Sequence, residues 1–192
     1  MSDPLYRTLR IIAILMTVAW VGWSFYDGML KESKPGDSDY HAANRAFEDG
    51  NYAEALEDYE RALEADNNNI FALRGKARSL MQLGRNQEAL EVFNQAIARD
   101  EKFAATYANR GILHDRMGNY QKAIADYEKA IALDSAITEG PNWLTRFLRM
   151  QPEKPPTIAD RARYLRQQLA KPEAERLLSV PEVDQQQRSY KM

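Results

Sequence analysis

The sequence predicts an all-α protein in which three helix pairs, stacked as a solenoid, follow an apolar N-terminal helix. Two observations carry this prediction: an uncharged run from Ile11 to Tyr26, and a repeat of 34 residues that extends over residues 36–137. A third observation limits the chemistry. The chain has no cysteine and only two histidines, which excludes disulfides, thiolate metal sites and cysteine nucleophiles.

The N-terminal apolar run has the length of a membrane span once its flanking aromatic residues are included. Ile11 to Tyr26 alone would extend about 24 Å as a helix, short of the roughly 30 Å hydrocarbon core. Tyr6 to Tyr26 spans about 30 Å, and tyrosine favours the two membrane interfaces. We therefore predict one transmembrane helix over residues 6–28, within an N-terminal anchor at 1–30 and followed by a polar linker at 31–39.

Two alternatives remain open for this segment. A cleaved signal peptide would use the small residues Gly22 and Ser24 to define a cleavage site before Phe25, although the surrounding aromatic side chains suit cleavage poorly. A helix buried in a protein core would have the same composition. The sequence favours the uncleaved anchor over both.

The charges that flank the apolar run determine its expected orientation. Arg7 and Arg10 precede the run, Lys31 and Lys34 follow it, and these side chains balance. The free α-amine and the short N-terminal tail favour an N-terminus inside the cytoplasm. The expected location is therefore a single-pass inner (cytoplasmic) membrane protein with a periplasmic helical region.

Residues 36–137 repeat with a period of 34, in units 36–69, 70–103 and 104–137. Glycine, alanine, aromatic and aspartate residues share this register. The four main columns are Gly50, Gly84 and Gly118; Ala55, Ala89 and Ala123; Tyr59, Phe93 and Tyr127; and Asp66, Asp100 and Asp134. The glycines separate two helical patterns, and the alanines and aromatics lie on one helix face. Each unit is therefore a helix pair that needs its neighbours to bury its apolar face.

This sequence resembles the tetratricopeptide repeat (TPR) family. The resemblance is carried by G-N-Y-x-x-A-L at 50–56, G-R-N-x-x-A-L at 84–90 and G-N-Y-x-x-A-I at 118–124. It implies a right-handed helical solenoid that binds other proteins and has no enzymatic activity. The family's co-chaperone members hold a terminal carboxylate with a lysine, asparagine and arginine clamp. Only Asn44 matches that clamp, so this ligand class is not expected.

Residues 138–180 are predicted to form capping and accessory helices, because the last repeat of a solenoid would otherwise expose an apolar face. The segment 142–150, with Trp143 and Phe147, is the expected cap. Thr157 and Asp160 resemble a capping box that opens a further amphipathic, arginine-rich helix. That helix is expected to pack on the 142–150 helix, with contact to a partner or to lipid headgroups as the alternative. Residues 181–192 are predicted to be extended or disordered.

In this family the first helix of each pair lines a concave groove, and carrying the register across gives the candidate partner-binding residues. They are Tyr40, Asn44, Phe47, Arg74, Arg78, Met81, Asn109, Ile112 and Arg116. Arg74 and Arg78 are four residues apart, so their guanidiniums share a helix face and are expected to grip a carboxylate together.

Other function classes have little support in the sequence. Residues 36–137 carry 12 Lys and Arg against 18 Asp and Glu, an acidic balance that argues against nucleic acid as a partner. The phosphate-binding, dinucleotide, serine hydrolase and zinc protease motifs are all missing from the chain. His114 occupies a packing column and is expected to be buried rather than catalytic. We expect no cofactor, no metal and no small-molecule substrate.

The sequence therefore predicts a membrane-anchored scaffold or adaptor that holds a protein or peptide in its groove and assists assembly of a membrane or periplasmic complex. Two alternatives keep the same architecture. One is a chaperone that holds unfolded clients, of the kind used in cytochrome maturation or secretion. The other is a permanent accessory subunit of a membrane complex.

Overall fold

The computed structural model describes residues 4–30, 34–140, 143–148, 150, 154–179 and 189–190, and every secondary-structure element in these ranges is helical. The chain divides into two units, Met1–Pro35 and Gly36–Met192. The first unit contains one helix, α1 (Pro4–Leu30), and the second contains all the others. Residues 31–33, in the predicted linker, lie outside the described residues.

Helix α1 is long and apolar enough to cross a membrane. Its stretch Tyr6–Tyr26 has a mean hydropathy of 1.6, and none of it is buried against the rest of the protein. Leu15, Trp20 and Phe25 are among the exposed apolar side chains of α1. A membrane anchor and a signal sequence both have this character.

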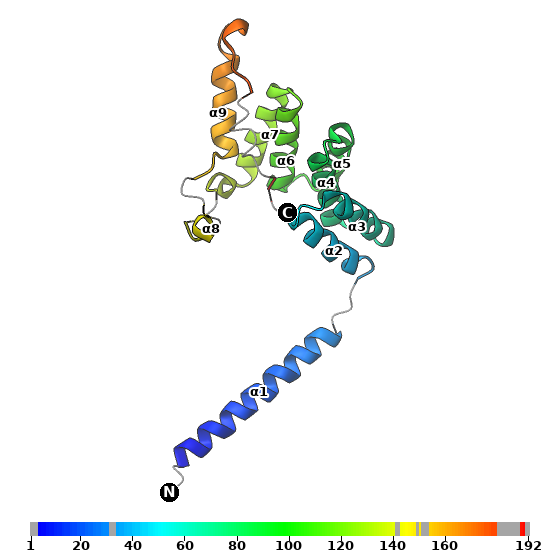
Figure 1. Ribbon diagram of the computed structural model, residues 1–192, viewed down its shortest axis with the longest axis vertical. Coiled ribbons are helices and arrows are strands. Elements are labelled where there is room, and N and C mark those ends of the chain that lie inside the picture. Colours follow the sequence, from blue (N-terminus) through cyan, green and yellow to red (C-terminus); the bar gives the residue numbers. More distant parts are fainter. Residues whose placement is uncertain are drawn as a thin grey trace. The chain divides into compact units, whose positions relative to one another are not determined.

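Six helices form three consecutive pairs, which confirms the predicted solenoid. The pairs are α2 (Asp37–Glu48) with α3 (Tyr52–Ala65), α4 (Ile70–Gln82) with α5 (Asn86–Arg99), and α6 (Ala104–Arg116) with α7 (Tyr120–Leu133). Figure 1 shows the pairs stacked in chain order. Helix α2 begins at Asp37, so residues 37–39 are helical and the linker is shorter than predicted.

The repeated glycines and aspartates form the two turns of each unit. Gly50, Gly84 and Gly118 have φ of 84°, 74° and 74°, the left-handed conformation that ends a helix and that glycine adopts without a Cβ clash. At the far end of each unit the aspartate carboxylate accepts a hydrogen bond from the backbone amide two residues later. This Asx turn explains the aspartate column of the sequence.

The core consists of the small and aromatic columns. Ala55, Ala89 and Ala123 are fully buried, and so are the aromatic rings of Tyr59, Phe93 and Tyr127. The helices of neighbouring elements approach closely at Gly75, where an added Cβ would lie 2.2 Å from the Tyr59 ring. Stacking of one pair on the next therefore depends on a small residue facing a large ring.

The cap of the solenoid is not the predicted 142–150 helix. That segment forms α8 (Trp143–Leu148), and Trp143 and Phe147 are 70% and 73% exposed, so they cover no apolar face. The cap is α9 (Ile158–Leu169), which packs on α7 and buries its apolar stripe in the core. The 3₁₀ helix η1 (Ser135–Thr138) joins α7 to this region, and a second one, η2 (Glu173–Glu175), follows α9.

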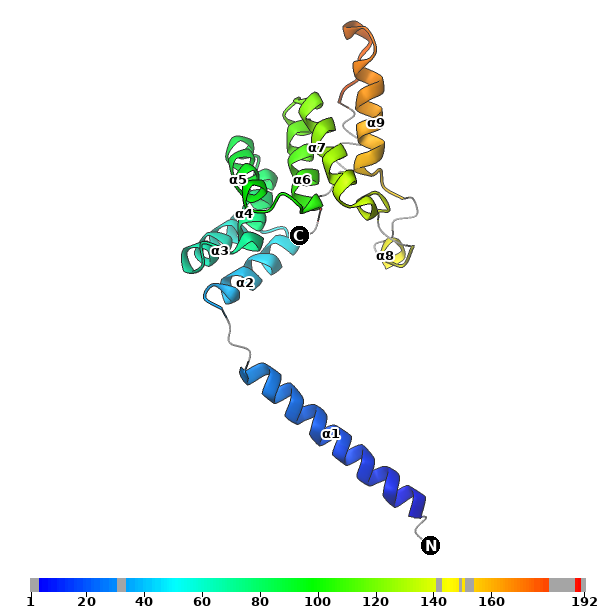
Figure 2. The same cartoon turned by 180° about the vertical axis from the view of Figure 1, so that it is seen from behind.

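Charged residues fix α9 against the last helix pair, beside α7 in Figure 2. Arg161 and Asp115 form a bidentate ion pair, with Nε–Oδ2 and Nη2–Oδ1 distances of 2.7 and 2.9 Å. Arg166 pairs with Glu128 of α7. The arginines of this helix thus bind the protein's own carboxylates. The predicted capping box is confirmed: Thr157 and Asp160 exchange hydrogen bonds at the start of α9.

Candidate functional site: a groove along the first helices

The first helix of each pair carries the candidate groove residues. Helix α2 contacts α4, and α4 contacts α6, so the three helices present adjoining surfaces. The remaining question is which of the predicted side chains are free to bind and which are used inside the protein.

At the α2 end, aromatic side chains form a half-buried cluster. The Tyr40 ring lies 6.2 Å from the Tyr59 ring and 6.4 Å from the Phe71 ring, between centroids. Burial raises the pKa of Tyr59 to about 12, so its hydroxyl stays protonated, and it donates a 2.7 Å hydrogen bond to Asn44 Oδ1. That oxygen of Asn44 is therefore engaged within the protein, whereas Phe71 is half exposed and available for contact.

Arg78 is a buried cation in the middle of the groove. Its side chain is 8% exposed, and its guanidinium carbon lies 4.1 Å from the centroid of the Phe47 ring, a cation–π contact. Burial lowers the pKa of Arg78. Within the described part of the chain Arg78 forms no ion pair. Its guanidinium donates to the Ser189 hydroxyl oxygen from Nε and Nη2, at 3.4 and 3.3 Å.

Asn109, on α6, binds the backbone N–H and C=O of one residue in the chain's own C-terminal segment. Its Oδ1 accepts a hydrogen bond from the Tyr190 backbone amide at 2.7 Å, and its Nδ2 donates to the Tyr190 carbonyl oxygen at 3.1 Å. The side chain is fully buried. Both functional atoms of the carboxamide are thus used on the main chain of an incoming segment, which makes the contact independent of that segment's side chain.

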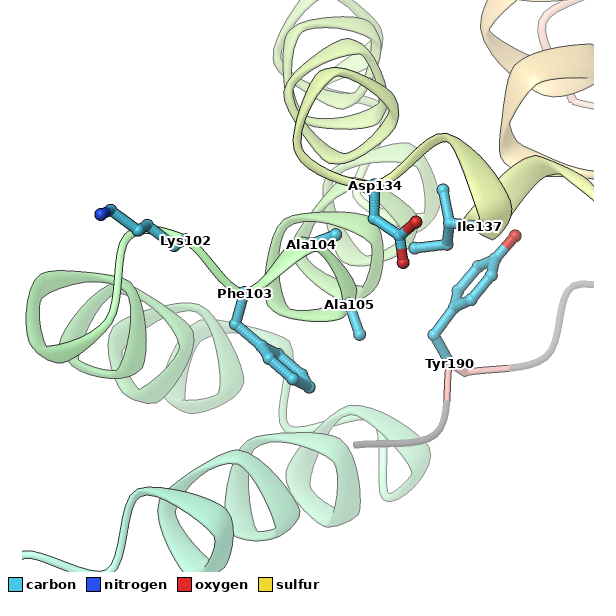
Figure 3. A pocket seen from close by; sticks show the side chains of 7 residues that line it. All are labelled: Lys102, Phe103, Ala104, Ala105, Asp134, Ile137 and Tyr190. Atoms are coloured by element: carbon cyan, nitrogen blue, oxygen red, sulfur yellow. The ribbon is translucent and has the colours of Figure 1, made fainter.

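The Tyr190 side chain fills one side of a cavity of about 280 Å³. The lining residues are Lys102, Phe103, Ala104, Ala105, Asp134, Ile137 and Tyr190 itself, and Figure 3 shows the Tyr190 ring beside Ile137. The ring packs against the solenoid core. Burial raises the pKa of Tyr190.

The predicted tail is therefore only partly as expected. Residues 180–188 and 191–192 lie outside the described residues. Ser189 and Tyr190 are described, lie outside helices, and contact Arg78 and Asn109. Tyr190 was overlooked because the last twelve residues contain little else that is apolar.

Four of the predicted groove residues have other surroundings. Met81 and Ile112 are 1% exposed and belong to the core, because the face of α4 and α6 that meets the second helices is wider than the sequence register implied. Arg74 is also 1% exposed, and its Nη2 lies 2.6 Å from Asp100 Oδ2. Asp100 therefore already supplies the carboxylate that Arg74 binds, and the prediction that Arg74 and Arg78 together grip a partner's carboxylate is wrong. Arg116 is the last residue of α6 and is exposed.

His114 is 6% exposed, as expected for a packing position, and burial lowers its pKa. In the ranges that the structure describes, no group of three or more His, Asp or Glu side chains could hold a metal ion. Sequence reasoning missed the Asp115–Arg161 pair; the only available signal was an aspartate that interrupts the apolar face of α6.

Two tetratricopeptide repeat profiles match the chain, one over residues 46–109 and one over residues 104–136. Together the two matches extend over residues 46–136. Solved structures show the same fold. The first TPR of Spaghetti (RPAP3) bound to the HSP90 peptide SRMEEVD is 21% identical, with a TM-score of 0.58, and the match covers 73% of this chain and 97% of that one. The TPR structure of MamA, 21% identical, matches with a TM-score of 0.52 over 66% of this chain and 75% of that one.

A curated relative adds a functional name. The Photosystem I assembly protein Ycf3 of Synechococcus sp. (strain CC9311) is 32% identical to this chain over 80 residues, which are 40% of this chain. The matched part is 46% of the length of that protein, so the chain spans about half of the relative. TPR domains bind peptide or protein partners.

Proposed function

We propose that this protein is a non-enzymatic scaffold that holds an extended segment of another protein in the groove of its repeats during assembly of a complex. The observation that carries the proposal is the Asn109 carboxamide, which is fully buried and directs its donor and its acceptor at the backbone C=O and N–H of one residue, Tyr190. A site that binds backbone accepts many sequences, and pockets beside it select among them.

The comparisons support the two parts of this proposal separately. The Spaghetti structure contains a bound peptide, which supports peptide capture by this fold. The relative named as an assembly protein supports a role in assembly. The complex that this protein would help to assemble is not given by either, and the proposal extends to membrane or periplasmic complexes only through α1.

We further propose that α1 anchors the repeats to the inner membrane through residues 6–28, with the N-terminus in the cytoplasm and the repeats in the periplasm. The exposed apolar surface of Tyr6–Tyr26 supports an anchor. An alkaline phosphatase fused after residue 192 should be active in cells. Inactivity together with fluorescence of a cytoplasmic reporter at the same position would reverse the orientation, and a mature N-terminus at Phe25 would replace the anchor by a signal peptide.

Peptide capture is tested with membranes from cells that express the tagged full-length chain. The double variant Arg78→Ala with Asn109→Ala removes the cation and the backbone contact of the groove. Loss of a charge-assisted hydrogen bond costs about 1.5–3 kcal/mol, so partner recovery should fall roughly 10- to 150-fold. Arg85→Ala is the matched control, because Arg85 is exposed and pairs with Glu88 outside the groove. If the double variant, with its circular dichroism unchanged, recovers partners as well as the control does, the groove is not the binding surface.

A further inference from the structure

We propose that the C-terminal segment around Ser189 and Tyr190 is an intrachain ligand of the groove, and that a partner displaces it with a segment in which an acidic residue precedes an aromatic one. This inference rests on the proposed function, because it names the regulation and the partner chemistry of the same groove. Three features of the contact support it: the backbone clamp, the aromatic pocket and the weak contact at Arg78.

The backbone clamp shows that the tail is bound as a ligand. The two hydrogen bonds between Asn109 and Tyr190, at 2.7 and 3.1 Å, join residues 81 positions apart in the chain. They are formed by a fully buried side chain with a main-chain unit of an otherwise separate segment. A competing segment can form the same two bonds in place of the tail, since they involve no side chain of the ligand.

The aromatic pocket selects the residue that follows. The Tyr190 ring packs on the core beside Ile137. That core includes Ile158, the first residue of α9, so the ring lies against a core shared by the last repeat and the cap. The pocket is lined by residues at the start of α6 and by Asp134 and Ile137, and it accepts a flat side chain with a polar end.

The tail binds weakly at Arg78. Arg78 is buried and stacked on Phe47, yet it faces a neutral hydroxyl at 3.3–3.4 Å, which is longer than an ordinary N–H···O bond. A carboxylate in the position of Ser189 would form shorter, charge-assisted bonds to the guanidinium, roughly twice as strong as neutral ones. An external segment with Asp or Glu at the position of Ser189 forms the charge-assisted bonds to Arg78 that the tail cannot form, so it can displace the tail.

Tethering explains why a weak contact would still occupy the groove. A ligand segment that belongs to the same chain as its site binds at an effective concentration of roughly 1 mM. If the Kd of the tail as a free peptide is about a tenth of that concentration, the tail weakens external ligands about tenfold. This competition is strong enough to matter and weak enough to be reversed by a better ligand.

The test uses a labelled synthetic peptide of residues 181–192 and fluorescence anisotropy with the protein in detergent micelles. The chain that ends at residue 180 should bind the peptide about ten times more tightly than the full chain does. In the shortened chain, Asn109→Ala should weaken binding at least tenfold, which corresponds to about 1.4 kcal/mol. Asn68→Ala, in the exposed turn between α3 and α4, is the control and should have no effect. Equal affinity of the full and shortened chains, or no binding to either, overturns the inference.

The partner chemistry is tested with a peptide that carries Ser189→Asp. It should bind the shortened chain at least fivefold more tightly than the unchanged peptide, and Arg78→Gln in the protein should abolish that gain. A peptide with Tyr190→Ala should lose binding. A Ser189→Asp peptide that binds no better, or one whose gain survives Arg78→Gln, overturns the assignment of an acidic partner.

Hydrogen exchange of the full chain distinguishes the tail of the same molecule from that of a second copy. The Tyr190 amide should be protected in the unaltered protein, lose protection in Asn109→Ala, and keep its protection on dilution. Protection that falls on dilution would mean that a second copy supplies the tail, which overturns the intrachain assignment. Failure of the proposed function is a separate result: partners would not be recovered even by the shortened chain, whatever the tail peptide does.

Discussion

The ion pair between Asp115 and Arg161 allows a quantitative test of how the cap is held. Both side chains are 4% exposed, and two hydrogen bonds of 2.7 and 2.9 Å join them. Asp115 also accepts a bond from the Tyr127 hydroxyl at 3.2 Å, and Arg161 donates to the Leu178 carbonyl at 3.0 Å. Each charge is therefore satisfied only while α6, α7 and α9 are assembled.

Replacing one partner should be far more damaging than replacing both. Asp115→Asn or Arg161→Met alone leaves a buried charge without its counter-ion, which costs about 3–5 kcal/mol. The double variant leaves no buried charge, and its cost should fall clearly below the sum of the single costs, by at least about 2 kcal/mol. With a urea dependence of about 1–3 kcal/mol/M, each single variant should lower the unfolding midpoint by roughly 1–5 M.

Urea unfolding of residues 36–192, followed by far-ultraviolet circular dichroism, measures these costs. Arg163→Met is the matched control on the same helix, because Arg163 is 68% exposed and pairs only with 51% exposed Asp160. Its effect should stay within about 0.5 kcal/mol. Single-variant costs that add in the double variant, or an Asp115→Asn cost near that of the control, would refute the view that a desolvated pair holds the cap.

Two further predictions concern the repeats. His114 is buried, and burial lowers its pKa from the ordinary 6.5. The unfolded chain therefore binds the proton at a higher pH than the folded chain does, and the free energy of unfolding should decrease as pH falls below about 6.5. His114→Leu, which copies Leu80 of the preceding unit, should reduce the difference in unfolding free energy between pH 5 and pH 7.5, measured by urea titration. An unchanged difference would contradict the assignment. Gly75→Ala should cost about 1–3 kcal/mol, because its Cβ would lie 2.2 Å from the Tyr59 ring, and thermal unfolding indistinguishable from that of the unaltered protein would contradict this packing.

The candidate site was predictable only where the register of the repeat decides it. Tyr40, Phe47, Arg78 and Asn109 do lie on the first helices, because a period of 34 places equivalent residues on equivalent faces. The register could not tell a groove residue from a core residue at the edge of that face, so Met81 was misassigned. Nor could it show that a carboxylate 26 residues away neutralises Arg74.

The helix pairs follow from local properties of the chain. The residues that determine a helix pair act within one unit and its neighbour, so their pattern can be recognised in the sequence. They are the glycine at the turn, the alanine and the aromatic ring at helical spacing, and the closing aspartate. The cap and the occupant of the groove have a different origin. Helix α9 replaces the more apolar α8 as the cap because it can pair Arg161 with Asp115, and Tyr190 reaches Asn109 across 81 residues. Both contacts join segments that share no repeat register, so only the folded chain determines which surface meets which.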